Sequence, residues 1–317
     1  MGVMTTTALE SLRSMSGAEA ADFFAGADPE ELVALVRTTS DETLLDLIGR
    51  DEIRPAAVAG ILARLDEYAI PERLAEVSGV VRFDLQRRGR VIESQVLEFD
   101  RGSLRAVEPA DSPAPDVVIT TSLLRFVRLV SGEHNAGLEF LAGTLDIEGD
   151  ELLALAVGSL FRIPGTDEVA LDPTALDPVD VAGVLRDADT AHLRRVMAGE
   201  FRAIVLDEIF RRLPDFVNPR RAAKVQLVVA LRLTGRPDGG VDRHVVEVVE
   251  GRARVVAGEA DELRRDATVT CEAHDFLKLA TGNLNAVGAV LKGQLKVRGD
   301  RAKALQLTSV LDIPSAR

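Results

Sequence analysis

The chain has 317 residues, of which 46 % are hydrophobic, 4 % are aromatic and 28 % are charged. Because Cys271 is its only cysteine, the chain can form neither an internal disulfide nor a multi-cysteine metal site. The net charge of −13 argues against nucleic acid as the main partner, and no apolar run reaches the roughly 18 residues that a membrane-spanning helix needs.

The excess negative charge is confined to one half of the chain. Residues 1–164 hold 15 basic and 28 acidic side chains, whereas residues 165–317 hold 23 of each. The first residues lack a basic flank followed by an apolar core, so we expect no secretory signal and a cytoplasmic location. The 33 Arg against 5 Lys suggest a bacterial source.

The first half opens with short helical segments. Residues 1–15 are expected to form a flexible tail. Three helix starts follow: a capping box at Ser16-Gly-Ala-Glu19, Asp28 before a proline, and Ser40. A longer helix is predicted over 54–68, where apolar residues recur at helical spacing.

A sheet with covering helices is predicted next. Alternating apolar and polar residues are typical of strands with one buried face, and they recur before two further helices. The closing helix, 151–160, is apolar on nearly every side, so we expect it to be buried all round, plausibly against the other half of the chain. The five predicted strands cover 81–85, 91–99, 104–107, 116–121 and 145–148.

The second half repeats the first. Residues 131–164 and 281–314 align without a gap, and 13 of the 34 positions are identical. The chain is therefore a tandem duplication. In the second copy, helices are predicted after Asp177 and Asp189, over 201–216 and 276–280, between the cap Asn285 and the closing Gly293, and at the C-terminal end. Strands are predicted over 229–233, 244–249, 253–256, 266–271 and 295–298.

The spacing between the copies changes near their starts. Leu193 aligns with Leu32 at an offset of 161, whereas Ile209 aligns with Ile61 at an offset of 148. The slip of 13 residues is the length of one short capped helix, so we infer one additional helix in the first copy. The predicted domains are 16–164 and 178–317, joined by a proline-rich linker over 165–177.

The predicted class is α+β. Each copy reads as short helices, then a mostly antiparallel five-stranded sheet with helices on one face. This order, together with [ST]-G-x-x-N, G-x-L-x-[IV]-x-G-D and a closing apolar helix, resembles the sterol carrier protein type-2 (sterol-binding) domain. The resemblance is strongest at 281–300, TGNLNAVGAVLKGQLKVRGD, and extends to Asp116, Asp266 and the segment 80–85. It covers roughly 54–164 and 200–314.

The resemblance implies a non-enzymatic binding module without a cofactor. Members of this family enclose an apolar tunnel for sterols, fatty acids, fatty acyl-CoA or phospholipids. The alternative is a scaffold or dimerisation module with collapsed tunnels, for which a homodimer is a plausible assembly. An aliphatic wall discriminates poorly among aliphatic guests, so the ligand's identity stays open.

The candidate tunnel residues are apolar and face the space between sheet and helices. Periodicity alone favours the simpler hypothesis that they fill a closed core, and the resemblance makes the two readings about equal. The second copy has Gly288, Ala289 and Val290 where the first has Leu138, Glu139 and Phe140, which predicts a larger cavity in the second copy. The candidates are Phe126, Leu129, Phe140, Leu141, Leu145 and Ile147 in the first copy, and Phe276, Leu279, Val290, Leu291, Leu295 and Val297 in the second.

A charge difference accompanies the last strand and helix of each copy. Solvated faces are the simplest explanation, because exposed ion pairs contribute little. Alternatively, the basic set contacts an anionic headgroup, an acyl-CoA phosphate or a membrane surface, or the two lobes attract each other. The basic set is Lys292, Lys296, Arg298, Arg301 and Lys303, and the first copy has Ala142, Asp146, Glu148, Glu151 and Leu153 at these positions.

The remaining reactive side chains give no catalytic or metal-binding pattern. The four histidines, His134, His192, His244 and His274, lack metal-ligand spacing, so surface or capping positions are expected for them. Cys271 shares strand parity with Val269, which predicts a small buried core residue.

Overall fold

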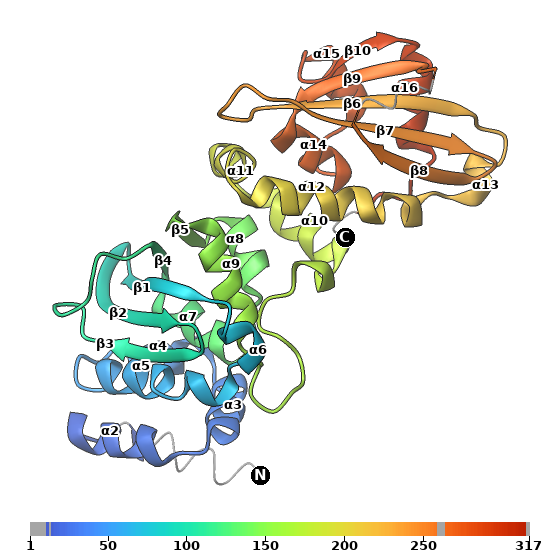
Figure 1. The fold of residues 1–317 in the computed structure, drawn as a ribbon. Helices are drawn as coiled ribbons and strands as arrows, with labels where there is room; N and C mark the ends of the chain where they lie inside the picture. Colours follow the sequence, from blue (N-terminus) through green and yellow to red (C-terminus); the bar gives the residue numbers. More distant parts are fainter. Residues whose placement is uncertain (1–10, 13, 259–263, 315–317) are drawn as a thin grey trace. The chain divides into compact units, whose positions relative to one another are not determined.

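The computed structural model describes residues 11, 12, 14–258 and 264–314. The chain divides into two compact units (Figure 1). The boundary lies between Asp172 and Pro173, except that the short segment Leu141–Gly143 belongs to the second unit. Most of the predicted N-terminal tail lies outside the described residues. In the part of the chain that is described, no helix combines the length and the apolar character needed to cross a membrane.

The first unit begins with a set of short helices whose starts are fixed by caps. Ser16 forms the predicted capping box with Glu19, and the side chains of Asp28 and Ser40 accept hydrogen bonds from backbone N–H groups of the helices that follow them. The helix predicted over 54–68 is shorter, because Arg64 leaves the helical conformation. The helices are α2 (Gly17–Gly26), α3 (Pro29–Thr38), α4 (Asp41–Ile48), α5 (Arg54–Leu62) and α6 (Pro71–Leu74), with a 3-10 turn, η1, at Leu65–Tyr68.

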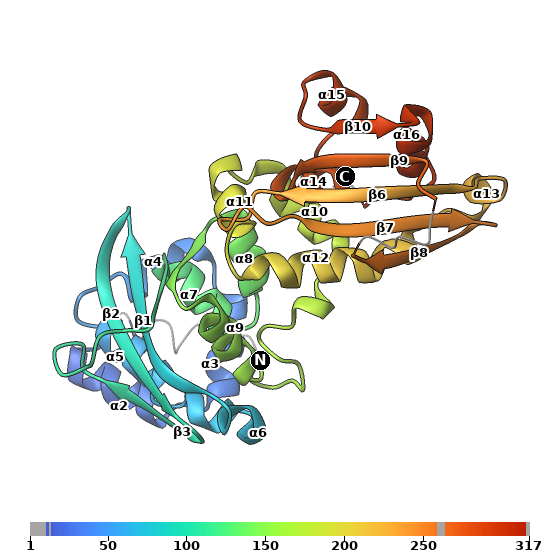
Figure 2. The ribbon, with the colours of Figure 1, turned by 45° about the horizontal axis from the view of Figure 1, so that its top comes forward.

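A five-stranded mixed sheet follows, in the order β3-β2-β1-β4-β5 (Figure 1). Figure 2 shows β1, β2 and β3 of this sheet from another side. All neighbouring strands are antiparallel except the central pair, β1 and β4. The predicted mostly antiparallel sheet and the α+β class are therefore confirmed. Its elements are β1 (Ser78–Arg87), β2 (Arg90–Asp100), β3 (Ser103–Val107), β4 (Val117–Ser122), α7 (Leu123–Val130), α8 (Ala136–Ala142), β5 (Leu145–Gly149) and α9 (Glu151–Leu160).

The second unit repeats this architecture. Its sheet has the order β10-β9-β6-β7-β8, and only the central pair, β6 and β9, is parallel. Its strands are β6 (Leu227–Thr234), β7 (Asp242–Val249), β8 (Arg252–Ala257), β9 (Ala267–Glu272) and β10 (Lys296–Gly299). Its helices are η2 (Pro173–Ala175), α10 (Pro178–Asp187), α11 (Thr190–Val196), α12 (Phe201–Arg212), η3 (Leu213–Phe216), α13 (Pro219–Ala222), α14 (Ala273–Ala280), α15 (Ala286–Leu291) and α16 (Arg301–Ser309).

The duplication is longer than the sequence comparison indicated. Helices α3 and α10 both begin after a capping aspartate and a proline, Asp28 and Asp177, which sets an offset of 149. Leu193 therefore corresponds to Leu44, and the predicted alignment with Leu32 is wrong. The first unit does contain one helix, α2, without a counterpart among the described residues, but it precedes the repeat, so the slip of 13 residues from which an additional helix was inferred does not exist. Leucines that recur at helical spacing allow several alignments of the two copies, whereas a capping residue fixes where a helix begins and so allows only one.

Each unit contains an equivalent buried polar contact between a helix and its sheet. The guanidinium Nε of Arg54 lies 3.2 Å from the Glu93 carboxylate, and that of Arg202 lies 2.6 Å from the Asp242 carboxylate. The first pair joins α5 to β2, and the second joins α12 to β7.

Two further polar positions in the central strands are also duplicated. A carboxylate oxygen of Asp116 accepts the backbone N–H of Val80 at 2.8 Å, and Asp266 does the same for Val228. Gly149 and Gly299 have φ values of 101° and 85°, and a Cβ on either would overlap the backbone carbonyl of the corresponding aspartate. Only glycine fits that turn.

The closing helix of the first unit is less buried than expected. Leu153 and Leu160 of α9 lie in the core, but Leu152 is 50 % exposed. The prediction that this helix is buried all round is therefore wrong. A helix packed on a sheet on one side keeps a solvent face even where that face is apolar.

Candidate functional site

The second unit encloses an apolar cavity of about 200 Å³ between its sheet and its helices. Leu231, Val269 and Val297 form the sheet side of the cavity. They lie in register across β6, β9 and β10, so their side chains share one face. The helix side is apolar as well, and it includes Ile204, Val205, Ile209, Phe276, Leu277, Leu279, Val290, Ala304 and Leu307.

Few polar groups reach this cavity, and those at one end of it are engaged elsewhere. Arg212 donates hydrogen bonds to the backbone carbonyls of Leu176, at 2.6 Å, and Thr174, and it pairs with Glu208. A hydrogen bond from Arg211 and the nearby charge of Arg212 hold the pKa of the Glu208 carboxyl below its ordinary value. Because these groups already have partners, the wall offers an incoming molecule mainly hydrocarbon contacts.

Five of the six tunnel candidates of the second copy line this cavity. They are Phe276, Leu279, Val290, Leu295 and Val297. Leu291 does not, because it is 83 % exposed. Helix α15 has only six residues and ends at Leu291, so with Ala289 buried and Val290 on the cavity, Leu291 falls on the outer side.

Of the six candidates of the first copy, Leu141 lines this cavity, and residues 141–143 belong to the second compact unit, whereas the other five lie elsewhere. Phe126, Phe140, Leu141 and Leu145 are buried, and Leu129 and Ile147 are half-buried. A cavity of about 100 Å³ in the first unit is lined by none of these six residues. It lies among α3, α4, α5 and α7, and its lining includes Val33, Val36, Leu44, Ile48, Ile61 and Val127.

Larger side chains occupy the first unit at positions that line the cavity of the second. Strand register places Phe83 opposite Ile119, as Leu231 lies opposite Val269, and the ring centroid of Phe83 is 5.9 Å from that of Phe126. Phe140 and Phe161 likewise replace Val290 and Leu311. The sequence comparison found only Phe140. The cavity of about 100 Å³ in the first unit, and a further pocket of about 430 Å³ beside α2 and α5, lie away from the predicted tunnel, so their volumes do not test the predicted order of the two tunnels.

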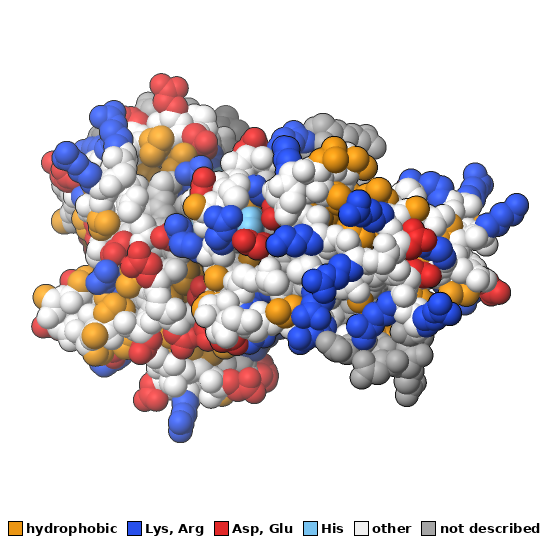
Figure 3. All heavy atoms as spheres, turned by 90° about the horizontal axis from the view of Figure 1, so that it is seen from above, with side chains coloured by type: hydrophobic (Ala, Val, Ile, Leu, Met, Phe, Trp, Pro, Cys, Tyr) orange, Lys and Arg blue, Asp and Glu red, His pale blue; other side chains and the backbone are white. Residues whose placement is uncertain are grey.

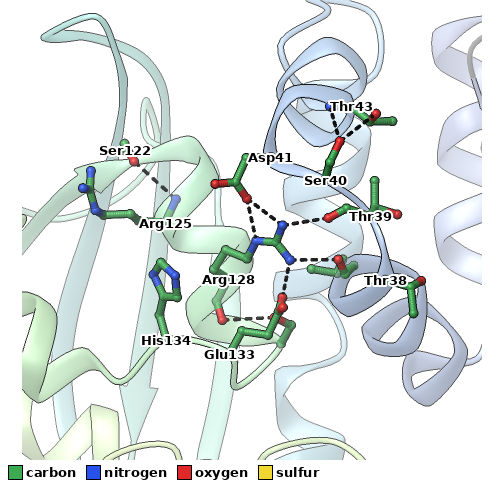
Figure 4. Close-up of polar contacts among 12 residues, drawn as sticks. Thr38, Thr39, Ser40, Asp41, Thr43, Ser122, Arg125, Arg128, Glu133 and His134 are labelled. Atoms are coloured by element: carbon green, nitrogen blue, oxygen red, sulfur yellow. Dashed lines mark hydrogen bonds and ion pairs between the residues drawn. The ribbon is translucent and has the colours of Figure 1, made fainter. Parts of the chain in front are cut away.

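A buried arginine fastens the short helices of the first unit to α7. Arg128 is 7 % exposed, and its guanidinium donates to Asp41 at 2.6 Å, to the carbonyl oxygen of Thr39 at 2.7 Å and to Glu133 at 2.5 Å (Figure 4). The corresponding Lys278 donates to Thr190 at 2.7 Å. Because the donors of Arg128 are used in holding α3 and α4 to α7, we assign it a structural role.

The histidines are more buried than expected. His192 and His274 are buried, and His244 stacks on Phe210 with ring centroids 3.8 Å apart, so the expectation of surface or capping positions is wrong for these three. Burial lowers the pKa of His244 and His274. His134 is exposed, as expected, and its ring lies 2.8 Å from Glu139. Among the residues described, no group of three or more His, Cys, Asp or Glu side chains could hold a metal ion.

Cys271 is buried, as its strand parity predicted. Burial raises the pKa of its thiol to about 12. The thiolate, which is the nucleophilic form, is therefore scarce at neutral pH.

The basic residues predicted to meet an anionic group fall into two classes. Lys292, Lys296, Arg298 and Arg301 are exposed. Lys303 is only half-exposed, because its ammonium reaches the carbonyl oxygen of Gln226 and lies 3.7 Å from Asp266.

Comparison with known proteins supports the family. The SCP-2 sterol transfer family model matches residues 59–162 and 206–312, more than half of the chain. Over 112 residues the chain is 27 % identical to hydroxysteroid dehydrogenase-like protein 2 of Xenopus tropicalis, and over 107 residues it is 28 % identical to human sterol carrier protein 2. These matches cover 35 % and 34 % of this chain but only 26 % and 19 % of those relatives.

Among solved structures, the palmitated SCP2L2 of Aedes aegypti is 24 % identical. It matches with a TM-score of 0.30, over 36 % of this chain and 96 % of that one. The family assignment rests on the two model matches, each of which spans one sheet and its covering helices. The chain belongs to the SCP-2 sterol transfer family and contains two copies of its domain in tandem.

Proposed function

We propose that this protein is a cytoplasmic, non-enzymatic carrier that holds an apolar lipid in its second lobe, 178–317. The observation that supports this most directly is the cavity of about 200 Å³ between sheet and helices, together with membership of a sterol transfer family. Phe276, Leu279, Val290, Leu295 and Val297 would contact the cargo. Fatty acid, fatty acyl-CoA, sterol-like and isoprenoid chains all fit such a wall.

The size of the cavity suits part of a lipid better than a whole one. A cavity of about 150 Å³ holds a benzene-sized molecule, so the space here takes a short apolar segment unless α15 or α16 moves outward. A chain of about ten methylenes would gain roughly 8 kcal/mol from burial before the costs of ordering and association. The remaining affinity, micromolar or weaker, still allows a carrier to release its cargo.

For the first lobe, 16–164, we propose a scaffold or dimerisation role. Phe83, Phe140 and Phe161 occupy positions where the second lobe has smaller side chains, which supports a filled tunnel. Carriage rather than catalysis is supported by the protonated Cys271 thiol and by the structural use of Arg128.

Native mass spectrometry of the freshly purified full chain tests the carrier function. We expect a co-purifying lipid that organic extraction removes and a fluorescent fatty acid replaces. The double variant Leu231→Phe/Val290→Phe, which installs the side chains of the first lobe, should be empty and should bind at least tenfold more weakly. Val249→Phe, which adds bulk outside the cavity, is the matched control.

Two outcomes would contradict this function. A wild-type chain that is empty and ignores fatty acids would leave the scaffold role for both lobes. If the double variant co-purified with lipid and bound the fluorescent fatty acid as tightly as the wild type, the lipid would lie outside this cavity.

A further inference from the structure

Helix α15 has two apolar faces. Ala289 is buried and Val290 lines the cavity, whereas Val287 is 53 % and Leu291 is 83 % exposed. Residues four apart lie on the same side of a helix, so Val287 and Leu291 form one outward apolar surface. Packing within the lobe does not account for this surface, and exposed apolar patches of this kind mark sites of interaction.

The chain around this surface is strongly basic. Residues 286–303 contain five Lys and Arg side chains and one acidic residue, Asp300, whose carboxylate caps α16. Residues 136–153 of the first copy contain five acidic and no basic side chains. In Figure 3, which views the molecule from above Figure 1, Lys and Arg side chains gather around hydrophobic ones over the second unit.

Four of these cations are available to a partner. Lys292, Lys296, Arg298 and Arg301 are exposed, and none forms an ion pair with another residue of the described ranges. They lie on α15's end, on the edge strand β10 and at the start of α16, and so border one edge of the lobe. Positive charge without interleaved acidic groups complements an extended surface of negative charge.

We propose that this edge docks on an anionic lipid bilayer. Val287 and Leu291 enter the interface between headgroups and acyl chains, and the four cations contact lipid phosphates. Interfacial binding of this kind combines buried apolar area with attraction to anionic lipids. Because the inner face of α15 lines the cavity, docking places the cavity wall against the bilayer. The role of this docking, delivery or uptake of a lipid, presupposes the proposed carrier function, whereas membrane binding itself can be measured without it.

Vesicle co-sedimentation of the full chain tests this proposal. We expect binding to vesicles of phosphatidylcholine mixed with phosphatidylglycerol, much weaker binding to phosphatidylcholine alone, and weakening by salt. Lys292→Gln and Lys296→Gln should each reduce the partition coefficient about fivefold. Leu291→Ser should reduce it about tenfold or more. Fatty-acid binding should be unchanged in all three, because none of these side chains lines the cavity.

Matched controls are Leu152→Ser and Arg90→Gln, which alter exposed residues of the first unit and should bind vesicles as the wild type does. Equal binding to neutral and anionic vesicles, or wild-type binding by Leu291→Ser, would overturn the proposal. The proposal would also be overturned if the wild type did not bind vesicles but formed a dimer that Leu291→Ser dissociates. The surface would then serve self-association. If the chain bound vesicles but never held a lipid in its cavity, the docking proposal would stand and the carrier proposal would be rejected.

Discussion

The two lobes share the contacts that build the fold and differ in the side chains that fill it and surround it. The arginine–carboxylate pair, the aspartate that bridges the central strands and the turn glycine occur in both. The phenylalanines of the first lobe become leucine or valine in the second, and an acidic edge becomes a basic one. Contacts that set backbone geometry have been kept in both copies, whereas positions facing the cavity or solvent have diverged.

The largest expected effect comes from the shared buried pair. Arg202 also donates to the carbonyl oxygens of Met197, Leu233 and Thr234, whereas Arg54 meets two carboxylates, one of them exposed. Removing one partner of a buried pair costs about 3–5 kcal/mol. We expect Arg202→Met to lower the free energy of unfolding of the second lobe by that amount, and Arg54→Met to affect the first lobe less.

Hydrogen exchange monitored by mass spectrometry would measure the stability of each lobe separately. In Arg202→Met/Asp242→Leu, part of the loss should be recovered, because the largely buried Asp242 carboxylate, which Arg202→Met leaves with only the Arg236 pair at 3.3 Å, is removed as well. Equal losses from Arg54→Met and Arg202→Met would show that the backbone carbonyls add nothing to the second pair.

The second-largest effect is expected when the phenylalanines of the first lobe are replaced by the smaller residues of the second lobe. Phe83→Leu/Phe140→Val should create space in the first lobe and lower its free energy of unfolding by about 2–4 kcal/mol, because deleted core atoms leave a void. The variant should bind a fluorescent fatty acid at a second site, detected as a change in stoichiometry. A stability loss without new binding would mean that the first lobe collapses around the smaller side chains.

A moderate, pH-dependent difference is expected from His244. Burial holds its pKa below the ordinary value of 6.5, so below that pH the unfolded state binds more protons than the folded state. The stabilisation from neutral His244 is complete above pH 6.5 and is lost as the pH falls through the lowered pKa. Each unit of pKa shift corresponds to about 1.4 kcal/mol.

The measurement is the free energy of unfolding of the second lobe between pH 7.5 and pH 5. His244→Phe keeps a ring stacked on Phe210 and removes the titrating group, so its pH dependence should be flatter than that of the wild type. The same slope in both proteins would assign the effect to another group, of which His274 is the first candidate.

The smallest effect is expected at Lys303, where the first copy has Leu153. The ammonium of Lys303 lies 3.7 Å from Asp266 and both side chains are about one-third exposed. Such a pair contributes about 1 kcal/mol or less. Lys303→Leu should therefore change thermal stability little, as measured by calorimetry. A larger loss would mean that the hydrogen bond to Gln226 matters more than the charge pair.

Much of the fold could be predicted because its signals are local. Helix starts at Ser16, Asp28, Ser40 and Asp177 follow from side chains that cap the next few N–H groups. Strand alternation identified all ten strands among the described residues, and the repeat identified both sheets. The helix over 54–68 was predicted too long, because Arg64 donates a hydrogen bond to the backbone carbonyl of Ala27, a contact 37 residues away that local pattern does not reveal.

The candidate site was less predictable. Strand parity indicates which face a residue occupies, so Leu295 and Val297 could be found, and the apolar helical run over 276–280 pointed to Phe276. Helix α15 is too short to set a period, and Leu291 was placed on the wrong side. The offset of 148 already aligned Phe83 with Leu231, but only the strand register and the cavity lining show that this position faces the cavity.

The sequence by itself determined the duplication, the α+β class, the sheet strands and the charge asymmetry, because each depends on residues close together in the chain or on a simple count. Only the tertiary structure decided which lobe leaves space between sheet and helices, which apolar side chains point outward and which arginines are buried. These properties depend on side chains far apart in sequence, whose combined volume and direction appear only when the strands are in register and the helices are packed on them.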